Sequence, residues 1–223
     1  MAPKSSSKRQ HRVSKRKPTK TKMSTQVSQP EASGSSSSPV YFWRDADPLT
    51  GYLSQWYPCA FTDDEDPSIV YRTAEHYMMY HKALLFSDTA TAQEILTANQ
   101  HPRKVKELGR TVGNFSEETW NAHREEIVRK GNLLKFTRPA NPDDGTWTVA
   151  AAGGKNLREL LLETGDREIV EASPYDRIWG IGFVAGKAEG ERERWGLNLL
   201  GKALMEVRAE LRDQGEKGEK AEK

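Results

Sequence analysis

Three groups of residues in this 223-residue chain have types and spacings that could perform chemistry. The first is the segment Thr73-Ala74-Glu75-His76-Tyr77, at the predicted start of a helix that also carries Lys82. At helical spacing Glu75 and Lys82 lie on one face, so a carboxylate and an ammonium could together handle a polar substrate. Glu75 could equally do no more than interact favourably with the helix dipole in the first turn.

The second group lies in the glycine-containing stretch 171–182, directly after a predicted strand. It combines two carboxylates, Glu171 and Asp176, with the indole of Trp179 and the flexible Gly180. Active sites favour such loops, because the backbone can approach a ligand at glycine and an indole can stack on a flat ring. The alternative is a surface turn in which Trp179 is a buried anchor.

The third group is Trp195-Gly196-Leu197-Asn198-Leu199-Leu200-Gly201, in which Asn198 is placed to cap the last predicted helix. The capped N-terminus of a helix can hold a phosphate. The signal is weak, since most Asn caps bind no ligand.

Other kinds of site are excluded by the sequence. The five histidines show no metal-ligand spacing, and the single cysteine, Cys59, can form neither a disulfide framework nor a thiolate zinc site. No phosphate-binding glycine loop occurs. We therefore expect no metal and no cofactor.

The elements that must position these residues are mostly helical. Apolar periodicity and capping residues predict helices over Thr73–Phe86, Pro102–Leu108 (with Gly109 beyond its end), Ser116–Phe136, Leu157–Glu163 and from Asn198 onward, the last with an apolar stripe of Leu200, Ala203, Leu204, Val207 and Leu211. Short strands are predicted at Val40–Trp43, Ile69–Tyr71 and Ile169–Ala172, and a loop or weak hairpin at Pro139–Gly154. The expected fold class is α+β, predominantly α-helical, in a single compact domain.

Charge and composition divide the chain into three parts. The first 40 residues carry nine Lys or Arg and one acid, whereas the whole chain has a net charge of only +2. Residues 1–39 are also poor in large apolar side chains, so we expect a disordered basic and Ser-rich tail. The domain is expected over residues 40–213, followed by a frayed charged tail over 214–223.

The cellular context follows from what the sequence lacks. A single cysteine suits a reducing compartment, no apolar stretch is long enough to span a bilayer, and no secretory signal is recognisable. We expect an intracellular protein, cytoplasmic or nuclear, with no membrane partner. The basic tail is either a nucleic-acid arm or a nuclear-localisation or solubilising segment.

In order along the chain, these segments resemble the YbiA-like, or NADAR, domain family from about Tyr41 to Leu211. The resemblance is carried by short motifs in the family's order: Leu53-Ser54-Gln55-Trp56-Tyr57-Pro58, Thr73 to Tyr77 with Lys82, Leu108-Gly109-Arg110, Trp120, Leu134-Lys135-Phe136, Leu160 to Gly165, Val170-Glu171-Ala172 with Asp176 and Trp179 to Gly182, Asn198 to Gly201, and Leu204 to Arg208. No single motif is diagnostic, but their common order is specific.

This resemblance implies a compact α+β domain that cleaves N-glycosidic bonds without a metal. The substrate would be a phosphorylated ribosyl-pyrimidine, an early riboflavin-pathway intermediate, or an ADP-ribosylated guanine in nucleic acid. Carried over by position, the catalytic residues would be Glu75, Asp176 and Glu171, and the substrate-binding residues Lys82, Lys135, Trp179, Arg110, Gly180 and Asn198.

The chemistry of the bond assigns roles to these groups. Cleaving a ribose–nitrogen bond makes C1′ oxocarbenium-like, so a carboxylate near C1′ and a proton for the leaving base both help. We expect Glu75 to act as base or electrostatic stabiliser, shared with Asp176 or Glu171, Lys82 and Lys135 to bind phosphate, and Trp179 to stack on the base. The alternative is a non-catalytic ADP-ribose or nucleotide-binding module.

Overall fold

The computed structural model describes residues 38–97, 101–143 and 145–221, with side chains as far as residue 217. Nearly all of the predicted disordered tail (residues 1–39) lies outside the described residues. None of the helices within these ranges has the length and apolar character needed to cross a membrane.

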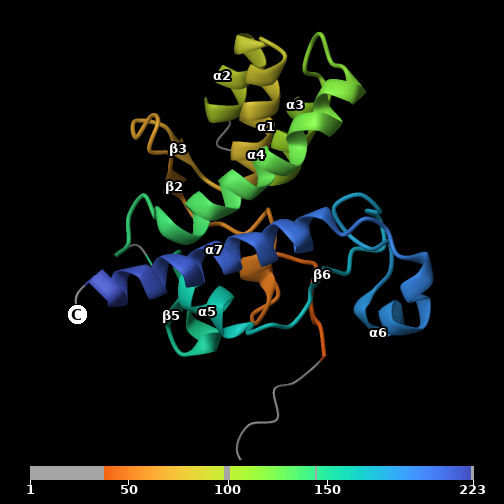
Figure 1. Cartoon of the computed structure of the whole chain (residues 1–223). Coiled ribbons are helices and arrows are strands. Elements are labelled where there is room, and N and C mark those ends of the chain that lie inside the picture. Colours follow the sequence, from red (N-terminus) through yellow and green to blue (C-terminus); the bar gives the residue numbers. More distant parts are fainter. Residues whose placement is uncertain (1–37, 98–100, 144, 222–223) are drawn as a thin grey trace, which may run out of the picture. The chain divides into compact units, whose positions relative to one another are not determined.

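Helices dominate the fold, and the predicted α+β, predominantly helical class is confirmed (Figure 1). The helices are α1 (Ala74–Leu85), α2 (Thr89–Thr97), α3 (Pro102–Arg110), α4 (Glu117–Thr137), α5 (Leu157–Glu163), α6 (Ala185–Ala188) and α7 (Leu199–Ala221), with 3-10 turns at Gly51–Leu53, Ala150–Ala152 and Glu189–Arg194. The strands are β1 (Val40–Phe42), β2 (Phe61–Thr62), β3 (Val70–Tyr71), β4 (Thr148–Val149), β5 (Lys155–Asn156) and β6 (Ile169–Glu171).

Three predicted helix starts are confirmed by side-chain caps. The hydroxyl of Thr73 accepts the backbone N–H of His76 at the start of α1, and that of Ser116 caps α4. Asn156 and Glu159 form a reciprocal capping box at α5. Each cap satisfies a backbone donor that the helix cannot, an effect worth about 1 kcal/mol.

Helix packing sets the frame of the domain. Helix α1 packs against α2, α3 and α4, while α4 and α7 run side by side and α7 also packs on β6 (Figure 1). The predicted apolar stripe of α7 is buried throughout its length, at Leu200, Ala203, Leu204, Val207 and Leu211. A buried leucine of this kind contributes about 1.5–3 kcal/mol by leaving water, so the stripe holds α7 in place.

A short parallel ladder joins two segments that lie far apart in the sequence. Strand β1 pairs with β6, with Phe42 opposite Glu171, and the backbone N–H of Ala172 donates to the carbonyl of Phe42 at 2.7 Å. Because the pair is parallel, both strands end on the same side. The chain after β1 and the chain after β6 therefore leave the ladder together.

Three of the departures from the sequence-based prediction have clear physical reasons. Helix α2 was not predicted; only Ala92 and Ile95 of it are buried, so its apolar pattern is too sparse to recognise. Gly109 lies inside α3 rather than beyond its end, because α1 packs there: a Cβ at 109 would lie 1.9 Å from Met79 Sδ. Helix α7 continues to Ala221, well past Asp213. The Glu and Lys residues of this end have high helix propensity, which outweighs the cost of about 1 kcal/mol for each glycine.

Candidate active site

Glu75 lies in the first turn of α1 and is almost fully buried, with 4% of its surface exposed. Its backbone N–H donates to the carbonyl of Gln55 at 3.0 Å, which ties the helix start to the preceding loop. The next residue of that loop, Trp56, hydrogen-bonds to the Glu75 carboxylate through its side chain. An indole can only donate, so Trp56 stabilises the ionised form.

Glu171 is the last residue of β6, and Asn198 fixes its backbone. The amide Oδ1 of Asn198 accepts the N–H of Glu171 at 3.0 Å, and its Nδ2 donates to the carbonyl of Ile169 at 3.0 Å. Asn198 has a φ of 51° and is buried. The sequence predicted Asn198 as a helix cap, whereas its side chain instead binds the strand that presents Glu171.

Asp176 sits in the turn after β6. Its Oδ1 accepts the backbone N–H groups of Ile178 at 2.9 Å and Trp179 at 2.8 Å, which fixes the carboxylate within its own loop. Gly180 allows this loop to close on the strand, since a Cβ there would lie 2.7 Å from the Glu171 carbonyl oxygen. Gly180 is therefore needed for the shape of the loop, whatever else it contacts.

The structure brings the three predicted carboxylates into one electrostatic cluster, called here the carboxylate cluster (Glu75, Glu171 and Asp176). Burial raises the pKa of Glu75 to about 7, and the charge on Asp176 adds to this against the opposing effects of Lys106, Trp56 and Arg110. Burial raises the pKa of Glu171 to about 8, with further contributions from Asp176 and Glu75. Acids from α1, β6 and the following turn thus influence one another directly.

One oxygen of the cluster has no partner. Oε2 of Glu171 is shielded from solvent and has no hydrogen-bond partner within the part of the chain that the structure describes. A buried carboxylate oxygen without a partner costs free energy, and a protonated carboxyl group lowers that cost. Glu171 is therefore set up to hold a proton near neutral pH.

Two cations on α3 act on the carboxylate cluster, and one of them, Lys106, was not predicted from the sequence. Lys106 on α3 lowers the pKa of both Glu75 and Glu171, and Arg110, one turn further along α3, lowers that of Glu75. Arg110 was predicted and is exposed. The four-residue spacing of Lys106 and Arg110, which places them on one helix face, was the available signal.

Lys82 and Lys135, both predicted to bind phosphate, are held by backbone carbonyls. Nζ of Lys82 donates to the carbonyl of Gly109 at 2.6 Å. Lys135 is fully buried, and its Nζ donates to the carbonyls of Tyr52 at 2.6 Å and Ser54 at 2.8 Å. Burial lowers the pKa of Lys135 to about 8. Both residues position the segments beside the cluster, and their contact with phosphate stays a prediction.

Trp179 is half-buried beside a second cation that the sequence analysis missed. The guanidinium carbon of Arg124 on α4 lies 6.0 Å from the centroid of the Trp179 ring. The Nε of Arg124 is shielded from solvent and has no hydrogen-bond partner among the residues described. Nothing in the spacing between 124 and 179 indicates this contact, because it depends on how α4 packs.

The arrangement combines three acids, two of them with raised pKa values, with nearby cations. Such a group can donate a proton, accept one and stabilise developing positive charge within one site. Over residues 38–97, 101–143 and 145–221, no group of three or more His, Cys, Asp or Glu side chains could hold a metal ion.

Comparison with known proteins identifies relatives that cover most of the chain. The family described as NADAR domain matches residues 41–212. The N-glycosidase R617 of Acanthamoeba polyphaga mimivirus is 44% identical over 162 residues, which are 71% of this chain and 86% of that protein. The N-glycosidase Npun_R5314 of Nostoc punctiforme is 35% identical over 141 residues, 63% of this chain and 74% of that one.

A solved structure shares the fold. The NMR structure of the E. coli protein YbiA superimposes with a TM-score of 0.59 and 24% sequence identity, covering 80% of this chain and 88% of that chain.

Proposed function

Because this chain belongs to the NADAR domain family, we propose that it is an N-glycosidase, a hydrolase that cleaves the bond between a ribose and a base nitrogen. The family resemblance inferred from the motifs is confirmed by this match. The observation that carries the proposal for this chain is the carboxylate cluster, in which Glu75 and Glu171 have raised pKa values of about 7 and about 8. Raised values of this kind are typical of groups that transfer protons.

The proposed reaction divides the work among the three acids. Glu171, still largely protonated at pH 7, donates a proton to the leaving base as the C1′–N bond breaks. Glu75, in its ionised form, accepts a proton from the water whose oxygen bonds to C1′. Asp176 stabilises the positive charge at C1′, where an oriented carboxylate is more effective than solvent. Proton exchange with water then restores both glutamates.

Cations and the indole complete the proposed site. Lys106 and Arg110 supply positive charge for a substrate phosphate, and Trp179 stacks on the leaving base beside Arg124. Asn198 acts as a positioning residue, since it holds the backbone of Glu171. Lys82 and Lys135 would need to exchange their present carbonyl contacts to reach a phosphate.

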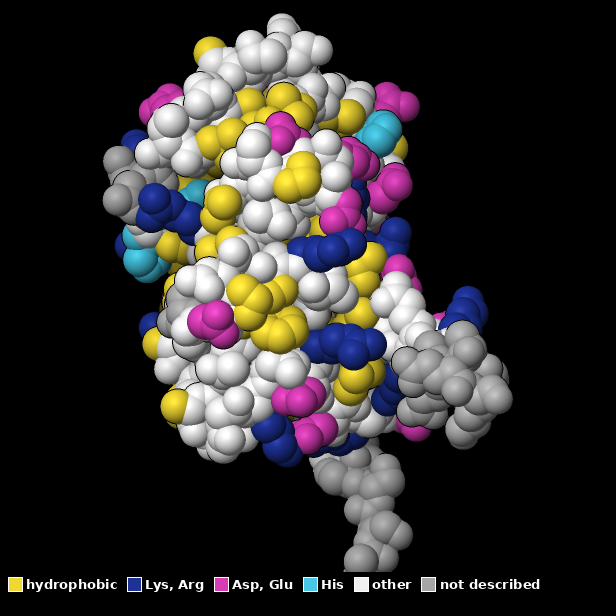
Figure 2. Space-filling model, turned by 90° about the vertical axis from the view of Figure 1, so that its left-hand side faces the viewer, with side chains coloured by type: hydrophobic (Ala, Val, Ile, Leu, Met, Phe, Trp, Pro, Cys, Tyr) yellow, Lys and Arg dark blue, Asp and Glu magenta, His cyan; other side chains and the backbone are white. Residues whose placement is uncertain are grey.

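Two substrates fit the proposal. One is a phosphorylated ribosyl-pyrimidine of the riboflavin pathway; the other is an ADP-ribosylated guanine base, alone or in nucleic acid. On the face shown in Figure 2, basic side chains are interspersed with acidic and hydrophobic ones and form no continuous basic surface. Contact with nucleic acid is proposed for the basic tail, residues 1–39, because it carries nine Lys or Arg and one acid.

A substrate panel tests the function. The purified full-length chain is incubated with the ribosyl-pyrimidine phosphate and with ADP-ribosylated guanine nucleotides, and the products are identified by mass spectrometry. We expect a free base together with ribose 5-phosphate or ADP-ribose. Thermal stabilisation by ribose 5-phosphate or ADP-ribose with no product from either substrate would contradict the enzyme and favour a non-catalytic binding module.

A further inference from the structure

A loop before α1, residues 52–56 and called here the Glu75 loop, lies between helix α4 and the carboxylate cluster. On the cluster side, the carbonyl of Gln55 accepts the backbone N–H of Glu75 at 3.0 Å. The side chain of the next residue, Trp56, hydrogen-bonds to the carboxylate of Glu75. On its other side, the loop is held by two polar side chains of α4.

These two side chains, Asn132 and Lys135, are three residues apart and therefore project from one face of α4. Nδ2 of Asn132 donates to Oε1 of Gln55 at 2.9 Å. Nζ of Lys135 donates to the carbonyls of Tyr52 at 2.6 Å and Ser54 at 2.8 Å. The three bonds fix the backbone of the Glu75 loop and the side chain of the residue whose carbonyl binds α1.

Neither side chain is a favourable choice for the interior. Asn132 and Lys135 are both completely buried, with 0% of their surface exposed. The ammonium has lost its hydration, and Oδ1 of Asn132 has no hydrogen-bond partner among the residues that the structure describes. Both groups cost free energy relative to apolar side chains of similar size. Stability alone therefore does not explain why one helix face directs an amide and an ammonium at one loop.

We propose that Asn132 and Lys135 are positioning residues for Glu75, because they hold the Glu75 loop where its backbone and the Trp56 side chain bind Glu75. The proposal deepens the proposed function and rests on it, since it takes Glu75 as the group that accepts a proton from water. Lys135 then acts on the reaction through the loop. A displaced loop leaves Glu75 in the site but misaligned, and a misplacement of about 1 Å can reduce a rate about 10²-fold.

The first test is Asn132→Leu, which removes the amide at nearly constant volume. We expect kcat to fall about tenfold or more while KM changes less than about twofold, measured on the substrate that the panel identifies. The acidic limb of the pH profile of kcat/KM should move to higher pH, because Trp56 is no longer held against Glu75. When Asn132→Leu is combined with Trp56→Phe, the limb should move no further than in Trp56→Phe alone, since both changes break one chain of contacts.

Two further variants and a control complete the set. Gln55→Met breaks the same bond from the loop side, so it should reproduce the effect of Asn132→Leu and decides the question if that variant does not fold. Lys135→Met should move the acidic limb in the same direction. A raised KM with an unmoved limb in Lys135→Met would instead indicate contact with the substrate and would overturn its positioning role. The matched control is Thr137→Val, which removes an α4 hydroxyl that donates to the carbonyl of Leu133 at 2.7 Å, and it should leave both kcat and the limb unchanged.

A measurement without substrate separates this proposal from the proposed function. The pKa of Glu75 is followed in the full-length chain by NMR of its labelled carboxylate carbon. We expect this pKa to rise in Asn132→Leu, in which the charged groups that also shift it, Lys106, Arg110 and Asp176, are unchanged. A raised pKa in a chain that hydrolyses neither substrate would overturn the proposed function but not the positioning role. A lower melting temperature with an unmoved pKa would show that Asn132 is purely structural and would overturn the positioning role.

Discussion

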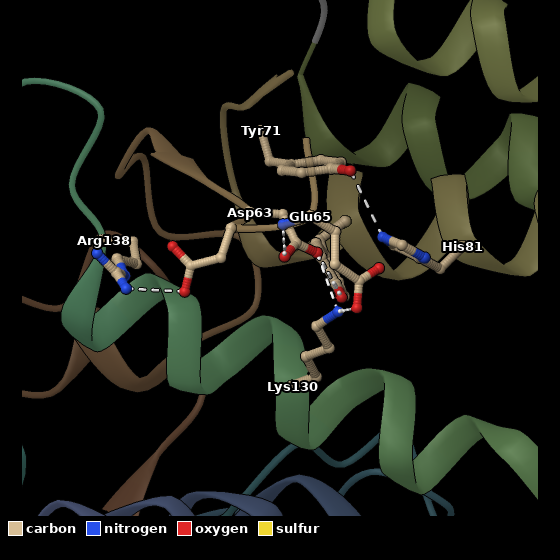
Figure 3. Close-up of polar contacts among 8 residues, drawn as sticks. Asp63, Glu65, Tyr71, His81, Lys130 and Arg138 are labelled. Carbon is tan, nitrogen blue, oxygen red and sulfur yellow. Dashed lines mark hydrogen bonds and ion pairs between the residues drawn. The ribbon is translucent and has the colours of Figure 1, made fainter. Parts of the chain in front are cut away.

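Acidic side chains are buried in two regions of the part of the chain that the structure describes, the β2–β3 hairpin and the carboxylate cluster. The hairpin, drawn in Figure 3, supplies its buried acid with a full set of partners, whereas the cluster does not. Asp63, 3% exposed, lies 3.2 Å from Nζ of Lys130 and accepts bonds from the hydroxyl of Tyr77 and the backbone N–H of Glu65. Burial alone would raise the pKa of Asp63, yet these contacts outweigh it and lower the pKa below its usual value.

The carboxylate cluster shows the opposite balance. Burial raises the pKa values of Glu75 and Glu171, and each acid raises that of its neighbours. Lys106 opposes this only in part, and Oε2 of Glu171 has no hydrogen-bond partner within the described ranges. The hairpin therefore keeps Asp63 ionised, and its charge stabilises the fold. The cluster instead holds Glu75 and Glu171 at pKa values near neutral pH.

The difference indicates where function resides. A buried acid that destabilises the fold persists when its reactivity is required, and strongly raised pKa values concentrate at functional sites. Mutations that remove the charge of one acid in each region test this comparison directly.

Glu75→Gln should have the largest effect. The change keeps the size and removes the ionisable group, so we expect kcat to fall by about 10²–10⁴-fold, the range typical of a proton-transfer group. Asp63→Asn is the same isosteric change in the hairpin and should leave kcat within about threefold at 25 °C, measured on the substrate that the panel identifies. If Glu75→Gln stays within a few-fold of the unchanged protein, the assignment of Glu75 is wrong.

Much of this arrangement could be predicted from the sequence. Capping residues such as Thr73 and Ser116 mark helix starts by local hydrogen bonding, and the α7 stripe marks a buried face by its period. The three acids could be named because the motifs that carry them resemble a family. Capping residues, apolar periodicity and the order of the family's motifs can all be identified in a linear sequence.

The partners of the acids could not be predicted in the same way. The spacing of Lys106 and Arg110 indicates a shared helix face, but only the packing of α3 shows that this face meets Glu75. Trp56 likewise reaches Glu75 through the packing of the loop before α1, and no local pattern records that contact. The same holds for the ring contact between Trp43 and Tyr175, which are 132 residues apart. Burial, which sets the pKa values of Glu75 and Glu171, is likewise a property of the folded chain.

A smaller effect is expected on stability, with opposite signs in the two regions. Asp63→Asn removes charged hydrogen bonds, and we expect a loss of about 1–3 kcal/mol, or a melting temperature lower by several degrees, at both pH 5 and pH 9. Glu171→Gln should raise the melting temperature at pH 9. The native pKa of about 8 exceeds the usual value of 4.5, so the native state loses stability as the pH rises between these values.

Thermal melts of both variants at the two pH values check this contrast. The stabilisation by Glu171→Gln should shrink strongly at pH 5, where native Glu171 is protonated and little of the penalty has accumulated. A stabilisation that is equal at pH 5 and pH 9 would show that the charge of Glu171 is not its cause.

The smallest expected effect comes from Trp56→Phe, which removes the donor that stabilises the ionised form of Glu75. Without it the pKa of Glu75 rises above about 7. If ionised Glu75 is the base, the acidic limb of the pH profile of kcat/KM moves to higher pH by up to about one unit, the effect of roughly 1 kcal/mol. Activity is then lost mainly at pH 6 and largely recovered at pH 8.

The control, Trp147→Phe, removes an indole that donates to the carbonyl of Lys135 at 3.0 Å and should leave the acidic limb of the pH profile in place. A uniform loss of activity at every pH in Trp56→Phe would mean that the indole acts through packing, and Glu75 would then owe its pKa to burial and the neighbouring charges alone.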